Sequence, residues 1–80
     1  MTPANPRDNI RRDIFSVKHW DHAIGAWCHG YMSKDREQAR RRTDAIRRGI
    51  WYGVHTTRAK LVHPAQWVVE GFIAAGNDIE

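Results

Sequence analysis

The chain has 80 residues, of which 41% are hydrophobic and 10% aromatic, so it is long enough for one small domain and too short for two. This hydrophobic content indicates a globular chain rather than a disordered one. The net charge of +4 points to an anionic partner, and a domain that buries only about 60% of its unfolded surface is expected to carry any activity on its outside.

Signals for export or membrane insertion are absent from the sequence. Cys28 is the single cysteine and cannot form an intramolecular disulfide bond. No apolar run approaches the roughly 20 residues that a membrane span needs, and the first residues lack a basic-then-hydrophobic signal pattern. We therefore expect a cytoplasmic protein with no membrane contact.

The chain divides into three parts by composition. Residues 1–9 contain two of the three prolines and no apolar periodicity, so we expect a flexible N-terminal arm. Residues 10–76 are expected to form a single compact domain, and residues 77–80 a C-terminal tail.

Three segments have the spacing of helices. In residues 17–30, apolar side chains recur at steps of three and four residues, with Ser16 as N-cap and Gly30 as a stop. Residues 34–49 are predicted to form a second, basic helix that Ser33 caps and Gly49 ends. A third helix is expected to follow Pro64 and to end before Gly76.

Residues 50–63 are rich in β-branched and aromatic side chains and predict two short strands that form a wing. Residues 56–59 lack the Gly, Asn or Asp that a tight hairpin turn prefers, so an irregular link between helices is the alternative. The predicted fold is mainly α with a small β-hairpin, three helices in a winged-helix-like arrangement, the alternative being an all-α bundle of three helices.

Positive charge is concentrated in the middle of the chain. Residues 34–60 carry nine basic and three acidic side chains, whereas residues 61–80 carry three acidic and no basic ones. Guanidinium groups suit phosphate and guanine because their planar fork donates two hydrogen bonds at once. The basic helix is therefore predicted to contact nucleic acid, the alternatives being an acidic protein partner or a solvated face with intrahelical ion pairs.

Residues 45–55 (AIRRGIWYGVH) and 61–69 (LVHPAQWVV) resemble the phage excisionase family of small MerR-like winged helices. Excisionases bend DNA beside an integrase and bias recombination toward excision, and some also repress a promoter. The resemblance implies that the following residues face the major groove: Arg40, Arg41, Thr43, Asp44, Arg47 and Arg48. It implies that Thr56, Thr57, Arg58 and Lys60 form the wing tip at the DNA backbone.

The predicted function is that of a non-enzymatic DNA-binding accessory or regulatory protein, excisionase- or repressor-like, of a phage or mobile element. Duplex DNA is the expected partner, contacted by the basic helix 34–48 and a wing near residues 55–60. The resemblance adds an integrase as a candidate partner and a further copy of the chain on DNA as another, although no residue shows self-association. The candidate nucleic-acid-binding residues are Arg36, Arg40, Arg41, Thr43, Arg47, Arg48, Thr56, Thr57, Arg58 and Lys60. The alternative is a small phage-type inhibitor or adaptor that binds a host protein with an acidic surface through the arginine-rich face.

Catalytic, metal and cofactor sites have little support in the sequence. His19, His22, His29 and Cys28 lie close together in the chain, but on the predicted helix they do not converge. No nucleophile motif or phosphate loop is present, so we expect no enzyme activity, metal or cofactor. Tryptophans can stack on bases in single-strand binders, but the helical spacing assigns Trp20, Trp27 and Trp67 to the core and leaves Trp51 as the most exposed.

Overall fold

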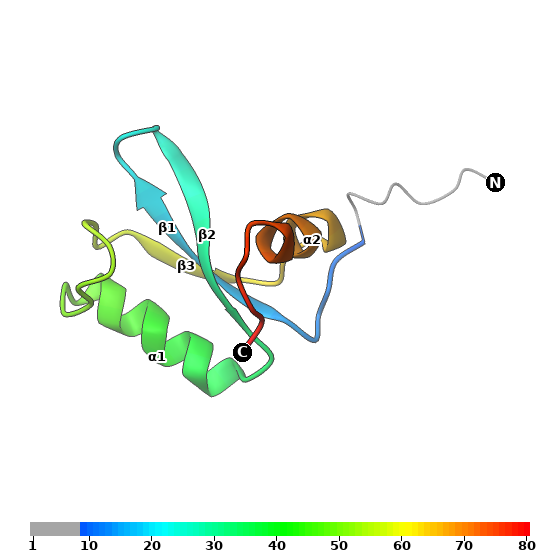
Figure 1. The fold of residues 1–80 in the computed structure, drawn as a ribbon. Helices are drawn as coiled ribbons and strands as arrows, with labels where there is room; N and C mark the ends of the chain where they lie inside the picture. Colours follow the sequence, from blue (N-terminus) through cyan, green and yellow to red (C-terminus); the bar gives the residue numbers. More distant parts are fainter. Residues whose placement is uncertain (1–8) are drawn as a thin grey trace.

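The computed structural model describes residues 9–80 and contains a three-stranded sheet and two helices (Figure 1). The predicted N-terminal arm, apart from Asn9, lies outside the described residues. The elements in chain order are β1 (Phe15–Asp21), β2 (Ala26–Ser33), α1 (Arg36–Arg47), β3 (Ala59–Val62) and α2 (Gln66–Ala74). The sheet is antiparallel with strand order β2-β1-β3, so β1 is the central strand.

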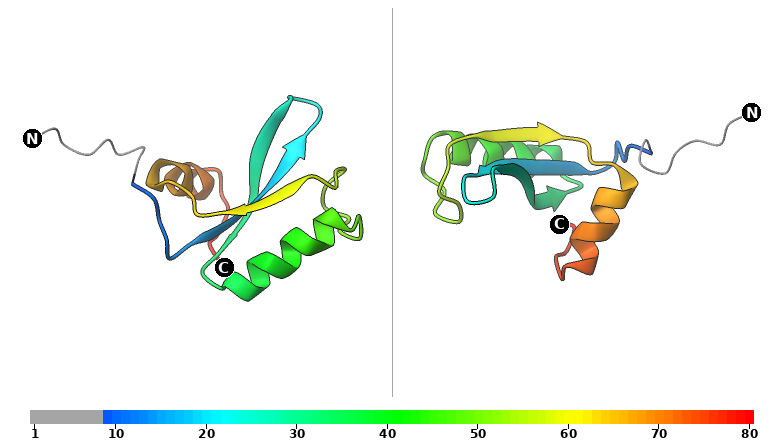
Figure 2. Two further views of the ribbon diagram at one scale, coloured as in Figure 1. Left: turned by 180° about the vertical axis from the view of Figure 1, so that it is seen from behind. Right: turned by 90° about the horizontal axis from the view of Figure 1, so that it is seen from above.

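The two helices lie on opposite faces of the sheet (Figure 2). The core under α1 consists of Val17, Tyr31, Ala39, Ile46 and Ala59. The core under α2 is smaller and consists of Ile14, Met32 and Val69. Within residues 9–80, neither helix has the length and apolar character needed to cross a membrane.

The prediction of a helix over residues 17–30 is wrong, because this segment forms the β1–β2 hairpin. The turn between the strands is built by Asp21, whose carbonyl oxygen accepts from the Gly25 amide at 2.9 Å and whose Oδ1 accepts from the Ala23 amide at 2.8 Å. Gly25 has a φ of +63°, a conformation that favours glycine. The predicted apolar stripe also fails at Ile24, which lies in the turn and is 66% exposed.

A β-bulge in β2 decides which of its side chains lie on each face of the sheet. Val17 pairs with Tyr31 and Lys18 with His29, so Gly30 is the extra residue on β2. A Cβ atom at Gly30 would lie 2.8 Å from Cε1 of His19, so a glycine makes room for the histidine ring. Because of the bulge, Trp27 and His29 lie on the same face as Lys18.

The predicted wing is also wrong. Residues 48–58 contain no strand and connect α1 to β3 irregularly, whereas β3 pairs with the free edge of β1. The guanidinium of Arg42 lies between the rings of Tyr31 and Trp51, 4.1 and 3.8 Å from their centroids. This stacking holds Trp51, at the start of the loop, against α1, so Trp51 does not form the strand that the predicted wing required.

The fold is therefore a small α+β fold of two helices and three strands, and the predicted three-helix, mainly α fold and its all-α alternative are wrong. The basic helix exists as α1, with Asp35 rather than Ser33 as its N-cap: Asp35 accepts from the backbone amides of Glu37 and Gln38. The last residue, Glu80, exchanges backbone hydrogen bonds with Met32 and Lys34, so the segment expected as a tail lies against the end of β2.

The core under α1 gives a stability prediction. Ile46→Ala removes a buried side chain from this core and is expected to lower the free energy of unfolding by about 2–5 kcal/mol, measured by urea denaturation. The matched control is Ile50→Ala, because Ile50 is 60% exposed and its truncation should change stability by less than about 0.5 kcal/mol. Equal effects of the two substitutions would contradict the packing of α1 on the sheet.

Candidate functional site

The sheet face opposite α1 carries tryptophans and cations at its hairpin end. Strand alternation places Lys18 and Trp20 of β1, Trp27 of β2 and Lys60 of β3 together there. Arg58 joins them because its carbonyl oxygen accepts from the Trp20 amide at 3.0 Å, which extends the β1–β3 pairing by one residue. We call these five residues the aromatic-basic face.

The side chains of the aromatic-basic face are in mutual contact. The Trp20 and Trp27 rings meet edge to face, with centroids 5.7 Å apart and an interplanar angle of 74°. Lys60 Nζ lies 4.4 Å and Lys18 Nζ 5.7 Å from the centroid of Trp27, and the Arg58 guanidinium lies 4.7 Å from that of Trp20. The rings thus hold three cations in a small area through cation–π attraction.

This concentration of charge has an energetic cost. Lys18 and Lys60 pair directly across neighbouring strands, where like charges destabilise a sheet. Within residues 9–80, the salt bridges do not involve Lys18, Arg58 or Lys60. Local arrangements that oppose stability in this way are characteristic of binding sites.

His29 lies beside this face and is held in place by a buried serine. Its Nδ1 is 2.6 Å from Oγ of Ser16, a side chain that is fully buried. Burial lowers the pKa of His29 from its ordinary value, and the nearby charge of Lys18 lowers it further. The folded protein therefore favours the neutral form of His29.

A groove of about 490 Å³ separates this end of the sheet from α2. Trp27 and His29 form one wall, and Trp67, Val68, Gly71 and Phe72 of α2 form the other. Trp27 thus belongs both to the groove and to the aromatic-basic face.

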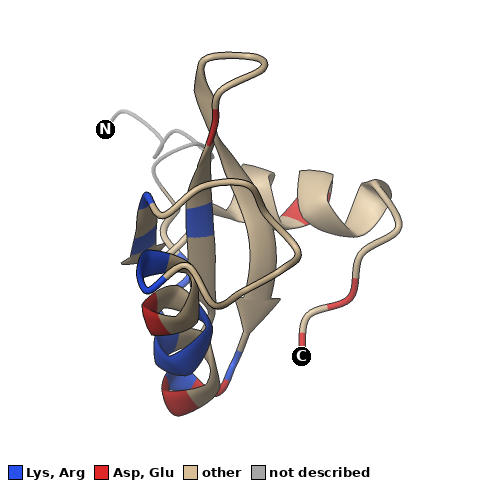
Figure 3. Ribbon diagram, turned by 90° about the vertical axis from the view of Figure 1, so that its left-hand side faces the viewer, with Lys and Arg blue, Asp and Glu red and all other residues tan. Residues whose placement is uncertain are grey.

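The predicted binding residues of α1 have different environments. Arg40 pairs with Glu37 at 2.6 Å and with Asp44 at 3.2 Å, and Arg41 pairs with Glu37 at 3.3 Å. Arg36 and Arg48 are exposed and form no side-chain hydrogen bond or ion pair within the part of the chain that the structure describes. α1 therefore presents acidic and basic groups side by side (Figure 3).

Two predicted residues of α1 have structural contacts. Thr43 is buried, and its Oγ1 donates to the carbonyl oxygen of Ala39 at 2.9 Å. Arg47 Nε donates to the carbonyl oxygen of Ala59 at 2.9 Å and so ties the helix to β3. Thr43 and the Nε of Arg47 are thus engaged within the fold.

The predicted wing residues do not share one surface with the basic face of α1. Thr56 Oγ1 accepts from the Arg58 amide at 3.1 Å, and Thr57 lies near Gly49 at the loop base. Arg58 and Lys60 contact tryptophans on the opposite side of the sheet from α1. The predicted set is therefore divided between two faces of the molecule instead of forming one surface.

Trp20, Trp27 and Lys18 are site residues that were not predicted from the sequence. Their helical spacing assigned the tryptophans to a core, yet Lys18–Trp20 and Trp27–His29 also alternate with the period of two that a strand requires. This alternation was the available signal.

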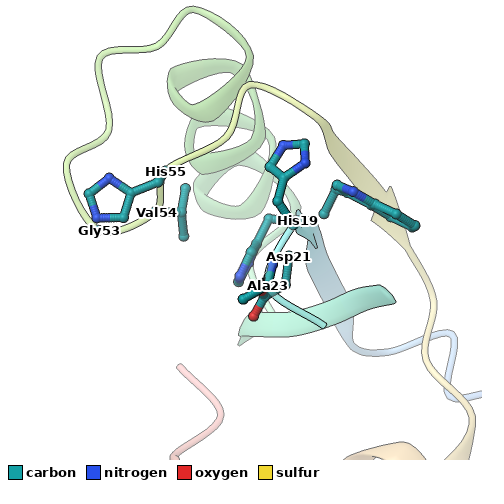
Figure 4. Close-up of a pocket in the computed structure, with 8 residues that line it drawn as sticks. His19, Asp21, Ala23, Gly53, Val54 and His55 are labelled. Carbon is teal, nitrogen blue, oxygen red and sulfur yellow. Dashed lines mark hydrogen bonds between the residues drawn. The ribbon is translucent and has the colours of Figure 1, made fainter. Parts of the chain in front are cut away.

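Histidines line a second hollow, of about 320 Å³, between the hairpin turn and the 48–58 loop (Figure 4). His55 lies on the loop, across from His19 and Asp21 at the end of β1. Among residues 9–80, no three His, Cys, Asp or Glu side chains lie close enough to hold a metal ion.

No family model, no curated protein and no solved structure matches the chain. The resemblance to excisionases stays a prediction, without the winged-helix fold that it implied.

The environment of His29 gives a pH prediction. Because the folded state lowers the pKa of His29, the unfolded chain takes up its proton first as the pH falls below about 6.5, and stability is lost over that interval. We expect wild type to lose more stability than His29→Gln between about pH 7.5 and pH 5, measured by thermal unfolding. His22→Gln, in the exposed hairpin turn, serves as control and should follow the wild-type profile. Parallel profiles of wild type and His29→Gln would contradict the assigned environment.

Proposed function

We propose that this protein is a non-enzymatic factor that binds single-stranded nucleic acid on its aromatic-basic face. The observation that carries the proposal is the contact of Lys18, Arg58 and Lys60 with the two tryptophan rings. Proteins that bind single strands commonly combine aromatic rings with cations. The bases stack on the rings, and the cations contact the phosphates along the strand.

A single strand suits this face better than a duplex. Duplex bases stack on one another and expose only their edges in the grooves, so they offer no ring face to Trp20 or Trp27. The unstacked bases of a single strand offer their ring faces, and each base stacked on an aromatic side chain contributes about 1–3 kcal/mol to the free energy of binding. The expectation that helix and wing together contact a duplex loses its geometric basis, because Arg58 and Lys60 lie across the sheet from α1.

The charge pattern of α1 also favours the sheet as the nucleic-acid surface. Glu37 and Asp44 lie among the arginines of α1, and both carboxylates repel phosphate while they engage Arg40. The cations of the aromatic-basic face have no such ion pairs within residues 9–80.

The proposed cellular role is that of an accessory or regulatory factor of a phage or mobile element, acting in the cytoplasm.

A second candidate function is binding to a protein with an acidic surface. One observation favours it: the loop after α1 presents Tyr52, which is 96% exposed, and Ile50 beside Arg41 and Arg48. Tyrosine and arginine are enriched in protein interfaces. This surface differs from the aromatic-basic face, so the two functions can be tested separately.

Two charge-matched triple variants test the proposal. Lys18→Gln/Arg58→Gln/Lys60→Gln removes the cations of the aromatic-basic face, and Arg36→Gln/Arg41→Gln/Arg48→Gln removes three cations from α1 and its C-cap. Binding to a fluorescent single strand is measured by anisotropy between about 50 and 200 mM salt. The sheet variant should bind more weakly, with a salt slope lower by about 2, since each phosphate contact on a single strand contributes about 0.7. The α1 variant should keep the wild-type slope.

The same titrations with a duplex distinguish the alternatives. If only the α1 variant has a lower salt slope, with the single strand or with the duplex, the result would contradict the proposal and support α1 as the nucleic-acid surface. Absence of binding to both forms by wild type would also overturn it and favour the protein partner.

A further inference from the structure

We propose that the groove between Trp27 and α2 binds one nucleobase of the strand, turned out of the stack. This inference rests on the proposed function and adds a defined subsite to it. A strand that crosses the aromatic-basic face reaches the groove directly, because Trp27 belongs to both.

The walls of the groove suit an aromatic ring. Its volume of about 490 Å³ falls in the range of sites for small molecules. Trp27 stands on the sheet wall, and Trp67 stands on the α2 wall together with Val68 and Phe72. Trp67 is 54% exposed although it is large and apolar, so it has surface available to a ligand.

Two polar groups in the lining can read the edge of a base. The buried hydroxyl of Ser16 needs an acceptor, and Nδ1 of His29 at 2.6 Å supplies it. In the tautomer in which the Ser16 hydroxyl donates to Nδ1, Nε2 of His29 carries the proton and is a donor toward the groove. Asn77 donates from Nδ2 to the carbonyl oxygen of Phe72 at 3.3 Å, which leaves its Oδ1 as an acceptor. A donor and an acceptor among apolar walls match the mixed edges of nucleobases.

Gly71 keeps the α2 wall open. A glycine inside a helix costs about 1 kcal/mol relative to alanine. Packing does not require it here, since a Cβ atom at Gly71 would meet nothing within 4 Å apart from neighbouring residues and the helix backbone. The space beside Gly71 is part of the groove.

The cations at the edge of the groove supply the phosphate contact of the same nucleotide. Lys18 and Lys60 lie over the ring of Trp27, so they stand where the strand enters. The ligand is therefore a base together with its phosphate, because a neutral apolar molecule gains no charge-assisted contact from the two lysines.

The test fills the groove without unfolding the helix. Gly71→Leu places a side chain in the groove, and Gly71→Ala is the matched control, because alanine improves the helix and leaves most of the space open. The probes are a thymidine strand of about 12 nucleotides and a strand of equal length with tetrahydrofuran in place of every base. Ile73→Ala is a second control, since Ile73 lies on α2, is 53% exposed and does not line the groove.

We expect Gly71→Leu to bind the thymidine strand roughly 5- to 100-fold more weakly than Gly71→Ala, the effect of losing one stacked base. Affinity for the abasic strand should be equal in both variants, and Ile73→Ala should match wild type. Equal affinities of Gly71→Leu and Gly71→Ala for the thymidine strand would overturn the subsite and leave the proposed function standing. Absence of binding to either strand by wild type would overturn both.

Discussion

The register of β2 against β1 is the constraint on which the rest of the surface depends. The central strand sends Val17 under α1 and Lys18 to the opposite face, and the bulge at Gly30 shifts β2 by one residue beyond that point. Without the bulge, Gly30 and Cys28 would stand opposite Lys18 and Trp20. With it, His29 and Trp27 occupy those positions, and one extra residue thus brings Trp27 to the face that carries Lys18 and Trp20.

The two faces of the sheet use arginine for different purposes. On the α1 side, two arginines stabilise the fold: Arg42 stacks on Tyr31 and Trp51, and Arg47 is tied to β3. On the other face, Arg58 contacts only the tryptophans among the aromatic and ionic partners that the structure describes, and Lys18 opposes Lys60 across the strands. Arginines that stabilise the fold are thus separated from the cations that contact the tryptophans and form no ion pair within residues 9–80.

The sequence predicted some elements because their signals are local. The basic helix follows from the polar residues before it and Gly49 after it, although its N-cap is Asp35 and not Ser33. The last helix has no side-chain cap and follows from Pro64 before it and Gly76 after it. The hairpin was missed because residues 17–30 satisfy helical and strand spacing at once, and the Asp21–Gly25 turn that decides between them lies inside the apolar run. The wing was predicted wrongly because β3 pairs with β1, some 40 residues earlier in the chain, a contact that no local pattern specifies. The division of the basic residues between two faces follows from the same pairing.

The central claim is that a single strand lies on the sheet and not on α1. The measurement that tests it most directly is a nuclear magnetic resonance titration of the ¹⁵N-labelled protein with a short thymidine strand, read at the backbone amides and the tryptophan indole N–H groups. The account predicts shifts at the indoles of Trp20, Trp27 and Trp67 and along β1 and β3, with little change at Trp51 or along α1. Shifts confined to α1 and the 48–58 loop would contradict it.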